Sequence, residues 1–360
     1  MKTLKNTPAT AGTLEILIRA EIRERGPMTF ARFMELALYH PEWGYYARAE
    51  SSKRVGRNGD FYTSVSVGPL LGRLLARQFA QWWKAMGEPA SFHLVECGGG
   101  DGQLARDILS ALEKDSPPCA RVARYTLIEP LPHLARQQKK MLANFSTVNW
   151  VGATDSLTSL EGVIFGNELL DSFPVHRLVF CKMEGEKWAE CCVTLEKDRL
   201  TWTQRSCPAS ASFSLPDHAR GITEHSPGTV QWLKEAARVL KHGRILLLDY
   251  GWTDEEYFQV ERPEGTLRAF RNHDVTADLL AVPGEQDLTA HVRWTPLLEQ
   301  ANLLRLRVEE FIQQGRWLTR IVAENQIVLD AREIRQFHTL THPEIMGASF
   351  RALALNKMSP

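Results

Sequence analysis

The sequence predicts an α/β fold with a mostly parallel sheet, added N-terminal helices and a small antiparallel insertion. Short apolar segments alternate with helical patterns from about residue 92 onward, and a glycine-rich turn follows the first segment. Strands that are apolar without alternation are typical of a parallel sheet covered by helices on both faces. With 44% hydrophobic residues among 360, the chain can bury a sizeable core.

The N-terminal region, residues 1–86, is predicted to be helical. Apolar residues recur there at helical spacing, and Gly26-Pro27 ends the first run. Thr29 has the hydroxyl that an N-cap of the second helix needs. Helices are expected over residues 14–25, 30–38 and 69–86. Residues 49–66 are rich in glycine, serine and arginine, and they predict a mobile loop that acts as a lid over a bound ligand.

The remaining residues, 87–360, carry the alternating pattern and are predicted to form the sheet domain. Strands are expected over residues 92–96, 125–128, 148–151, 162–165, 244–248, 304–311 and 350–355. Helices are expected over residues 103–112, 131–142 and 230–240. Three short segments with turns at 184–185 and 197–198 separate the fourth and fifth strands, which predicts an antiparallel insertion near residues 176–225.

Composition excludes several function classes. The 43 basic residues balance 43 acidic ones, so no global charge favours nucleic acid or a membrane surface. No segment approaches the ~20 apolar residues of a spanning helix, and the N-terminus lacks a signal-peptide pattern. The six cysteines include no C-x-x-C pair, which argues against a zinc site and a disulfide framework. We expect a cytoplasmic protein that binds no metal and no nucleic acid and does not insert into membranes.

The strongest local signal is the sequence ECGGGDG at residues 96–102, between a predicted strand and a predicted helix. The pattern acid-x-G-x-G-x-G is filled by Glu96, Gly98, Gly100 and Gly102. Glycine lets the backbone turn tightly and approach a ligand. A dinucleotide fingerprint that ends at Ala105 also fits the glycine spacing, but the carboxylates of Glu96 and Asp101 would repel a pyrophosphate. An ammonium and a sulfonium, as in S-adenosylmethionine, would be attracted; a turn without a ligand is the alternative.

Glu129 ends the second predicted strand, 27 residues after Gly102. An acid at this place in a doubly wound sheet can accept hydrogen bonds from ribose hydroxyls. The alternative is a surface glutamate before a proline. Together with the glycine turn, Glu129 favours a nucleoside ligand.

A second group of polar residues follows the fourth predicted strand, where ligands of open α/β sheets bind. Glu168 and Asp171 are spaced i, i+3, so one helical turn would place both carboxylates on one side. Two carboxylates beside the Asn167 amide suit a cationic substrate with several donors. A capped helix start with solvated acids is the alternative.

These motifs resemble the MidA-like S-adenosylmethionine-dependent methyltransferases, which include a mitochondrial complex I assembly factor that methylates protein arginine. The resemblance covers nearly the whole chain. It rests on segments at residues 26–46, 59–64 (GDFYTS), 96–109 (ECGGGDGQLARDIL), 128–130, 166–178 (GNELLDSFPVHRL), 246–251 (LLLDYG), 265–273, 283–292 (PGEQDLTAHV) and 346–355.

The resemblance implies a class I methyltransferase (Rossmann-like) fold and S-adenosylmethionine as the cofactor. It implies that the cofactor is held by Glu96, Gly98, Gly100, Gly102, Glu129 and Asp60. Glu168, with Asn167 and Asp171 beside it, would be catalytic and would face an arginine of a partner protein, in the family a respiratory-complex subunit.

The chain departs from the family pattern at three positions. Val65-Ser66 replaces a common Pro-Glu, and Arg293 stands where an acidic or amide residue is common. These changes remove acidic or amide character near the expected cleft, so the acceptor can differ from that of the family. The alternative function is a non-catalytic assembly factor that retains cofactor binding, whereas the acidic turn disfavours a nicotinamide oxidoreductase.

Overall fold

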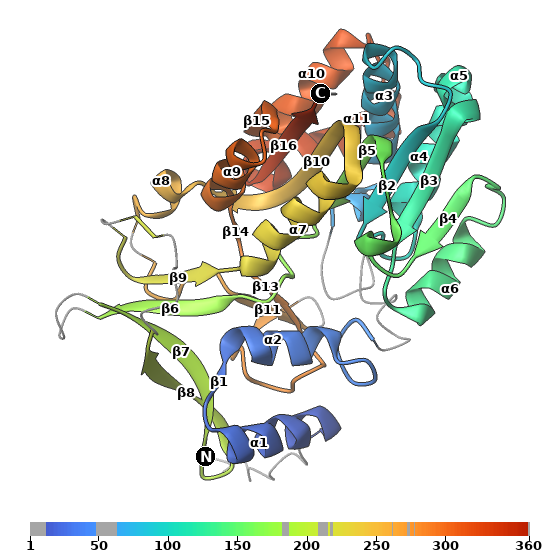
Figure 1. The fold of residues 1–360 in the computed structure, drawn as a ribbon. Helices are drawn as coiled ribbons and strands as arrows, with labels where there is room; N and C mark the ends of the chain where they lie inside the picture. Colours follow the sequence, from blue (N-terminus) through green and yellow to red (C-terminus); the bar gives the residue numbers. More distant parts are fainter. Residues whose placement is uncertain are drawn as a thin grey trace.

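The computed structural model describes residues 12–47, 63–181, 187–207, 215–216, 219–260, 262–271, 274–276 and 278–358. A large sheet covered by helices forms one part, and a small body of helices and antiparallel strands lies beside it (Figure 1). Among the described residues, no helix is long and apolar enough to cross a membrane.

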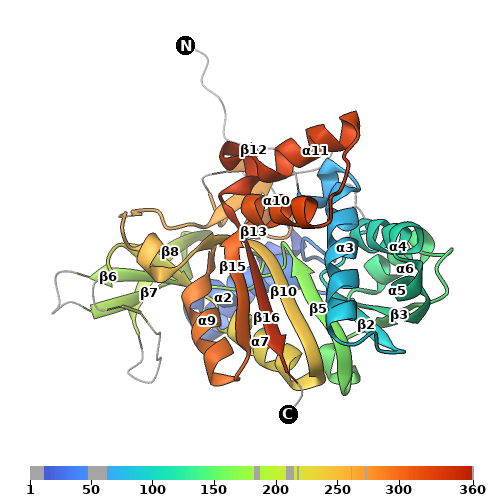
Figure 2. The same cartoon turned by 90° about the horizontal axis from the view of Figure 1, so that it is seen from above.

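The large sheet has the strand order β15-β16-β10-β5-β2-β3-β4 (Figure 2). Its strands are β2 (Phe92–Cys97), β3 (Ala123–Ile128), β4 (Val148–Val151), β5 (Leu160–Asn167), β10 (Leu240–Trp252), β15 (Arg307–Gln313) and β16 (Phe350–Lys357). The strands from β4 to β10 are parallel, and β16 is antiparallel to both β10 and β15. A short strand, β14 (Val292–Arg293), pairs in parallel with the carboxyl end of β10. The predicted, mostly parallel sheet is confirmed.

Consecutive strand residues point to opposite sides of a sheet. Because the central strands are apolar almost without interruption, both faces of this sheet are apolar. In β2, for example, Leu94 packs into one core and Val95 into the other. One core includes α3 (Leu70–Ala85), α4 (Gln103–Asp115), α10 (Gln314–Glu324) and α11 (Ala331–Thr341). The other includes α7 (Pro227–Val239) and α9 (Trp294–Leu303). The strand order reverses between β2 and β5, so the carboxyl ends of these two strands form the expected ligand crevice.

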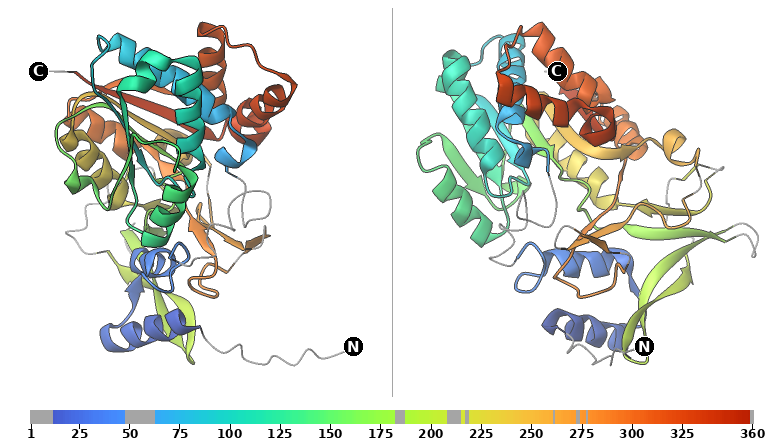
Figure 3. Two further views of the ribbon diagram at one scale, coloured as in Figure 1. Left: turned by 90° about the vertical axis from the view of Figure 1, so that its right-hand side faces the viewer. Right: turned by 180° about the vertical axis from the view of Figure 1, so that it is seen from behind.

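The small body contains α1 (Thr13–Arg25), α2 (Phe30–Tyr39) and two antiparallel sheets. Their strands are β1 (Met28–Thr29), β6 (His176–Cys181), β7 (Lys187–Glu196), β8 (Arg199–Ser206) and β9 (Ile222–His225), and β11 (Arg268–Arg271), β12 (Asp274–Thr276) and β13 (Asp287–Thr289). The predicted turn at Lys197-Asp198 is confirmed, with φ of 47° and 63°. The turn expected at 184–185 lies outside the described residues. Figure 3 shows α1 at the end of the small body far from the large sheet.

Packing divides the chain differently from the boundary expected at residue 86. The first two helices share a core with the inserted strands and with residues 267–290. Helix α3 instead packs its leucines and Phe79 into the core of the large sheet. The reason is that the sheet needs an apolar cover, and α3 carries the widest apolar stripe of the N-terminal region. The three-stranded sheet was not predicted, because segments of three or four residues show no usable periodicity.

Six further elements, three helices and three short helical turns, connect these parts. They are α5 (Pro117–Val122), α6 (Pro132–Met141), α8 (Asp254–Tyr257) and short helical turns at Val65–Val67, Thr154–Ser156 and Pro343–Gly347. Most of the predicted lid, residues 49–66, lies outside the described residues. Its last part, residues 63–66, forms a hydrogen-bonded turn in which Thr63 and Ser64 are buried.

Candidate active site

The glycine turn lies at the carboxyl end of β2 and leads into α4. Gly98, Gly100 and Gly102 all have positive φ, which favours glycine. A Cβ atom on Gly98 would lie 2.9 Å from Leu169 Cδ1, whereas one on Gly100 would meet no atom within 4 Å. The turn therefore packs against residue 169 at its start and faces open space at Gly100, where a ligand can approach.

The charge of this turn suits a cation. Asp101 Oδ1 accepts a hydrogen bond of 3.0 Å from the Gln103 amide, so a carboxylate already occupies the beginning of α4. Glu96 is buried and accepts a 2.7 Å hydrogen bond from the Tyr125 hydroxyl, and burial raises its pKa to about 7. Within the described residues, no lysine or arginine pairs with Glu96. These residues fit a ligand with an ammonium and a sulfonium better than one with a pyrophosphate.

Glu129 lies at the end of β3 with 8% of its surface exposed. Its Oε1 accepts from the Leu131 amide at 2.9 Å, and its Oε2 accepts from Gln138 Nε2 at 2.8 Å. Burial raises the pKa of this carboxyl group, while the two donors act in the opposite direction. The same Gln138 nitrogen donates to the Gly100 carbonyl at 2.9 Å. Glu129 and the glycine turn are thus joined through one side chain, which the sequence did not reveal.

Glu168 lies at the carboxyl end of β5 with φ of 49°, in the left-handed region. Its Oε1 accepts from the Ser64 amide (2.8 Å), the Ser64 hydroxyl (2.5 Å) and Asn167 Nδ2 (3.2 Å). Within the described residues, Oε2 has no hydrogen-bond donor. Burial raises the pKa of Glu168, and the three donors lower it. The carboxylate is held through one oxygen, and the other has no protein donor among the described residues.

Asp171 is held by a different element. Its Oδ2 accepts a 2.8 Å hydrogen bond from the Tyr250 hydroxyl. Burial, and then the charge of Asp249, raise the pKa of Asp171 well above its usual range. The helical turn expected from the i, i+3 spacing does not form, because Glu168 has a left-handed backbone.

Asp249, on β10, holds the turn that carries these acids. Its Oδ2 accepts from the amides of Leu169 (3.1 Å) and Leu170 (2.8 Å). Asp249 is not one of the predicted site residues, although it lies in the LLLDYG segment. Its role depends on the parallel pairing of β10 with β5, which a single sequence does not show.

The three residues that depart from the family pattern, Val65, Ser66 and Arg293, each form hydrogen bonds with nearby residues. The Val65 carbonyl accepts a 3.1 Å hydrogen bond from Gln103 Nε2, which links residues 63–67 to the glycine turn. The Ser66 hydroxyl donates to the Thr63 carbonyl at 2.7 Å. Arg293 is buried and binds both carboxylate oxygens of a neighbouring aspartate, Asp254, at 2.8 and 2.6 Å. Its charge is therefore balanced inside the protein. Asp60, expected to bind the cofactor, lies outside the described residues.

Comparisons with known proteins agree with this geometry. A family model described as "Putative S-adenosyl-L-methionine-dependent methyltransferase" matches residues 74–312. A crystal structure of a Burkholderia thailandensis protein bound to S-adenosyl-homocysteine is 26% identical, with a TM-score of 0.82 over 98% of this chain and 95% of that chain. A native crystal structure from the same organism is 25% identical, with a TM-score of 0.80 over the same shares of both chains.

Two curated relatives are named protein arginine methyltransferase NDUFAF7. The Drosophila melanogaster homologue is 28% identical over 96% of this chain and 85% of its own length. The Homo sapiens protein is 25% identical over 93% of this chain and 81% of its own length. Both are named mitochondrial, so they do not support the expected cytoplasmic location.

Proposed function

The chain belongs to the family of S-adenosyl-L-methionine-dependent methyltransferases, and from this premise we propose that it methylates an arginine side chain of a partner protein. The observation that carries the proposal is the Glu168 carboxylate, held by Ser64 and Asn167 at Oε1 and open at Oε2. A guanidinium is a planar cation with several N–H donors, and it matches this carboxylate. The names of the relatives support the same acceptor.

The cofactor would be held by the glycine turn and Glu129. Gly98, Gly100 and Gly102 let the backbone approach it, and the Glu129 carboxylate can accept hydrogen bonds from ribose hydroxyls. When bound, S-adenosylmethionine supplies a methyl group on a positively charged sulfur. Asp60 remains a further candidate for this site.

Glu168 has two tasks in the proposed reaction. Arginine nitrogens are poor nucleophiles because their lone pairs are delocalised in the cation. Glu168 Oε2 can accept an N–H bond, draw the positive charge toward that nitrogen and hold a second nitrogen for attack. Because burial raises its pKa, Glu168 can also take up the proton that the methylated nitrogen releases. Asp171, which accepts a hydrogen bond from the Tyr250 hydroxyl and whose pKa is raised well above its usual range by burial, would support the turn without adding charge.

The non-catalytic alternative has less support. The changes at Val65, Ser66 and Arg293 leave Glu168 and its partners in place, and the relatives are named as enzymes. All six cysteines are free, which supports a reducing compartment, of which the cytoplasm is one.

The test is single-turnover methyl transfer to a partner protein captured with a labelled methyl donor. We expect Glu168→Gln to lower the rate about 10²–10⁴-fold, because the general base and charge partner are lost. Affinity for S-adenosylhomocysteine should stay unchanged. The control is Glu113→Gln, an exposed position on α4. Mass spectrometry that finds methyllysine, or an undiminished rate in Glu168→Gln, would contradict the arginine proposal.

A further inference from the structure

Gln138, in the middle of α6, is a fully buried polar residue at the edge of the cofactor site. Its side chain is 0% exposed. Nε2 donates to the Gly100 carbonyl at 2.9 Å and to Glu129 Oε2 at 2.8 Å. Oε1 accepts from the Trp150 indole nitrogen at 3.0 Å. Both N–H groups and the oxygen of this amide are therefore used.

The partners of Gln138 allow only one orientation of its amide. An indole N–H can only donate, so Trp150 must face the oxygen. A carbonyl and a carboxylate can only accept, so Gly100 and Glu129 must face the NH₂ group. The three partners come from the glycine turn, the end of β3 and β4. One side chain thus ties three elements that are separate in the sequence.

We propose that Gln138 is a positioning residue for the cofactor, holding the Glu129 carboxylate and the Gly100 peptide in the arrangement that S-adenosylmethionine binds. This proposal rests on the cofactor site proposed above. Glu129 and the glycine turn would contact different parts of the ligand, so their relative placement decides whether both can bind at once. Trp150 acts indirectly: its indole N–H donates to Gln138 Oε1 and so prevents the amide group from rotating by 180°.

Glu129 lies near other acids, so its ionised form depends on neutral donors such as Gln138. The charge of Glu129 raises the pKa of Glu96 on β2, so the two acids lie close enough to repel each other, and Asp101 follows Gly100. The charged or titratable residues of α6 are His133, Arg136, Lys139 and Lys140, of which Lys139 lies 5.5 Å from the Trp150 ring centre. The ionised form of Glu129 is instead stabilised by the neutral Leu131 amide and by Gln138.

Two substitutions at Gln138 predict opposite pH dependence for binding. Gln138→Met keeps the volume but removes the donor, so the pKa of Glu129 rises and affinity falls further as the pH is lowered. Gln138→Glu places a second carboxylate beside Glu129, so affinity is poor at high pH. It improves as the pH is lowered, because one shared proton restores a donor between the two groups.

The experiment is calorimetric titration of the full chain with S-adenosylhomocysteine at about pH 6 and about pH 8. We expect Gln138→Met to weaken binding about 10–100-fold at the higher pH, as for a lost hydrogen bond to a charged group. Trp150→Phe, which removes the indole N–H donor and part of a ring packed against the core but leaves the Gln138 donors in place, should weaken binding less. The control is Gln137→Met, the preceding residue of the same helix, with wild-type affinity and pH dependence expected.

Two results would overturn the inference. One is wild-type affinity in Gln138→Met. The other is the same pH trend in Gln138→Met and Gln138→Glu, which would indicate a loss of packing only. If Gln138→Glu does not fold, Gln138→Met and Trp150→Phe still decide the question. A wild-type chain that binds no S-adenosylhomocysteine at either pH would instead overturn the cofactor site itself.

Discussion

Three carboxyl groups near the site, two buried and one half-buried, have no cationic partner among the described residues. Glu96, Glu168 and Asp249 accept hydrogen bonds from hydroxyl, amide and backbone groups only. Burial raises the pKa of each of them. A cationic ligand is the kind of molecule that would stabilise such acids when ionised, and without it their ionisation opposes folding.

Glu96 allows the cost of this ionisation to be measured. Its pKa is raised from 4.5 to about 7 in the folded protein, so the unfolded chain ionises first as the pH rises. Its stabilising contribution is therefore present below about pH 4.5 and lost as the pH passes about 7. We expect Glu96→Gln to raise the free energy of unfolding by roughly 2–3 kcal/mol at about pH 8 and to change it little at about pH 5. Urea denaturation without ligand at both values tests this, and an equal difference at both would contradict it.

Ser64 should control the protonation of Glu168. Ser64→Ala removes the hydroxyl at 2.5 Å and keeps the backbone donor at 2.8 Å. We expect the pKa of Glu168 to rise, so the acid limb of the pH–rate profile moves to higher pH and turnover near neutrality falls about 10-fold. Ser66→Ala is the matched control, because among the described residues that hydroxyl contacts Thr63 and not Glu168. A similar change of pH profile in both variants would show that only the shape of the turn matters.

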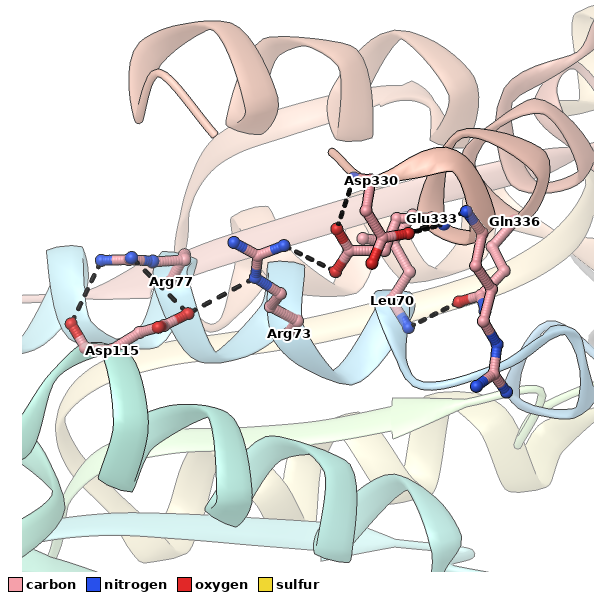
Figure 4. A network of polar contacts seen from close by, with 8 residues as sticks. Leu70, Arg73, Arg77, Asp115, Asp330, Glu333 and Gln336 are labelled. Carbon is pink, nitrogen blue, oxygen red and sulfur yellow. Dashed lines mark hydrogen bonds and ion pairs between the residues drawn. The ribbon is translucent and has the colours of Figure 1, made fainter. Parts of the chain in front are cut away.

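At the scale of elements, an ionic network joins α3 to α4 and α11 (Figure 4). Arg73 contacts Asp115 at 3.4 Å and Glu333 at 2.6 Å. The Leu70 amide donates to Gln336 at 3.1 Å in the same region. These contacts hold the beginning of α3, which follows directly after the turn that carries Ser64. The C-terminal helix α11 therefore supports, through α3, the segment that carries Ser64.

Arg73→Met should measure the strength of this network. The change keeps the apolar stem but leaves Asp115 and Glu333 without their common partner, both being less than one-fifth exposed. We expect a loss of about 1–2 kcal/mol in the free energy of unfolding. Arg23→Met is the control, since the pair Arg23–Asp198 is exposed and should contribute nothing measurable. Equal losses in urea denaturation would contradict a cooperative network.

Local patterns predicted most elements but few of their mutual contacts. Strand β4 has the predicted bounds, and Thr29 caps α2 as expected, because both depend on nearby residues. The glycine turn was likewise visible in its spacing. Asp249 binds the Leu170 amide 79 residues away, and Gln138 joins three elements. Such contacts follow from strand order and helix packing, so a single sequence could not reveal them.

At the scale of the whole molecule, residues 168–172, here called the acceptor turn after their proposed role, lie where the small body meets the large sheet. From the sheet, Asp249 holds the amides of Leu169 and Leu170. From the small body, the Ala290 amide donates to the Asp171 carbonyl at 2.9 Å, and the Tyr39 hydroxyl donates to the Ser172 carbonyl at 2.9 Å. The turn is therefore held from both sides, whereas the glycine turn, among the described residues, is contacted by Gln138 of α6 and packs against Leu169.

Tyr39→Phe should affect the acceptor turn without affecting the cofactor site. It removes one tie between α2 and the acceptor turn, so we expect a loss of about 1 kcal/mol in stability and a several-fold slower methyl transfer. Affinity for S-adenosylhomocysteine should not change, because Tyr39 does not contact the glycine turn. Tyr257→Phe removes an equivalent hydroxyl from the Ile222 carbonyl and Glu224, away from the turn. It should cost similar stability without slowing transfer, so equal rates in the two variants would show that the small body does not position the acceptor turn.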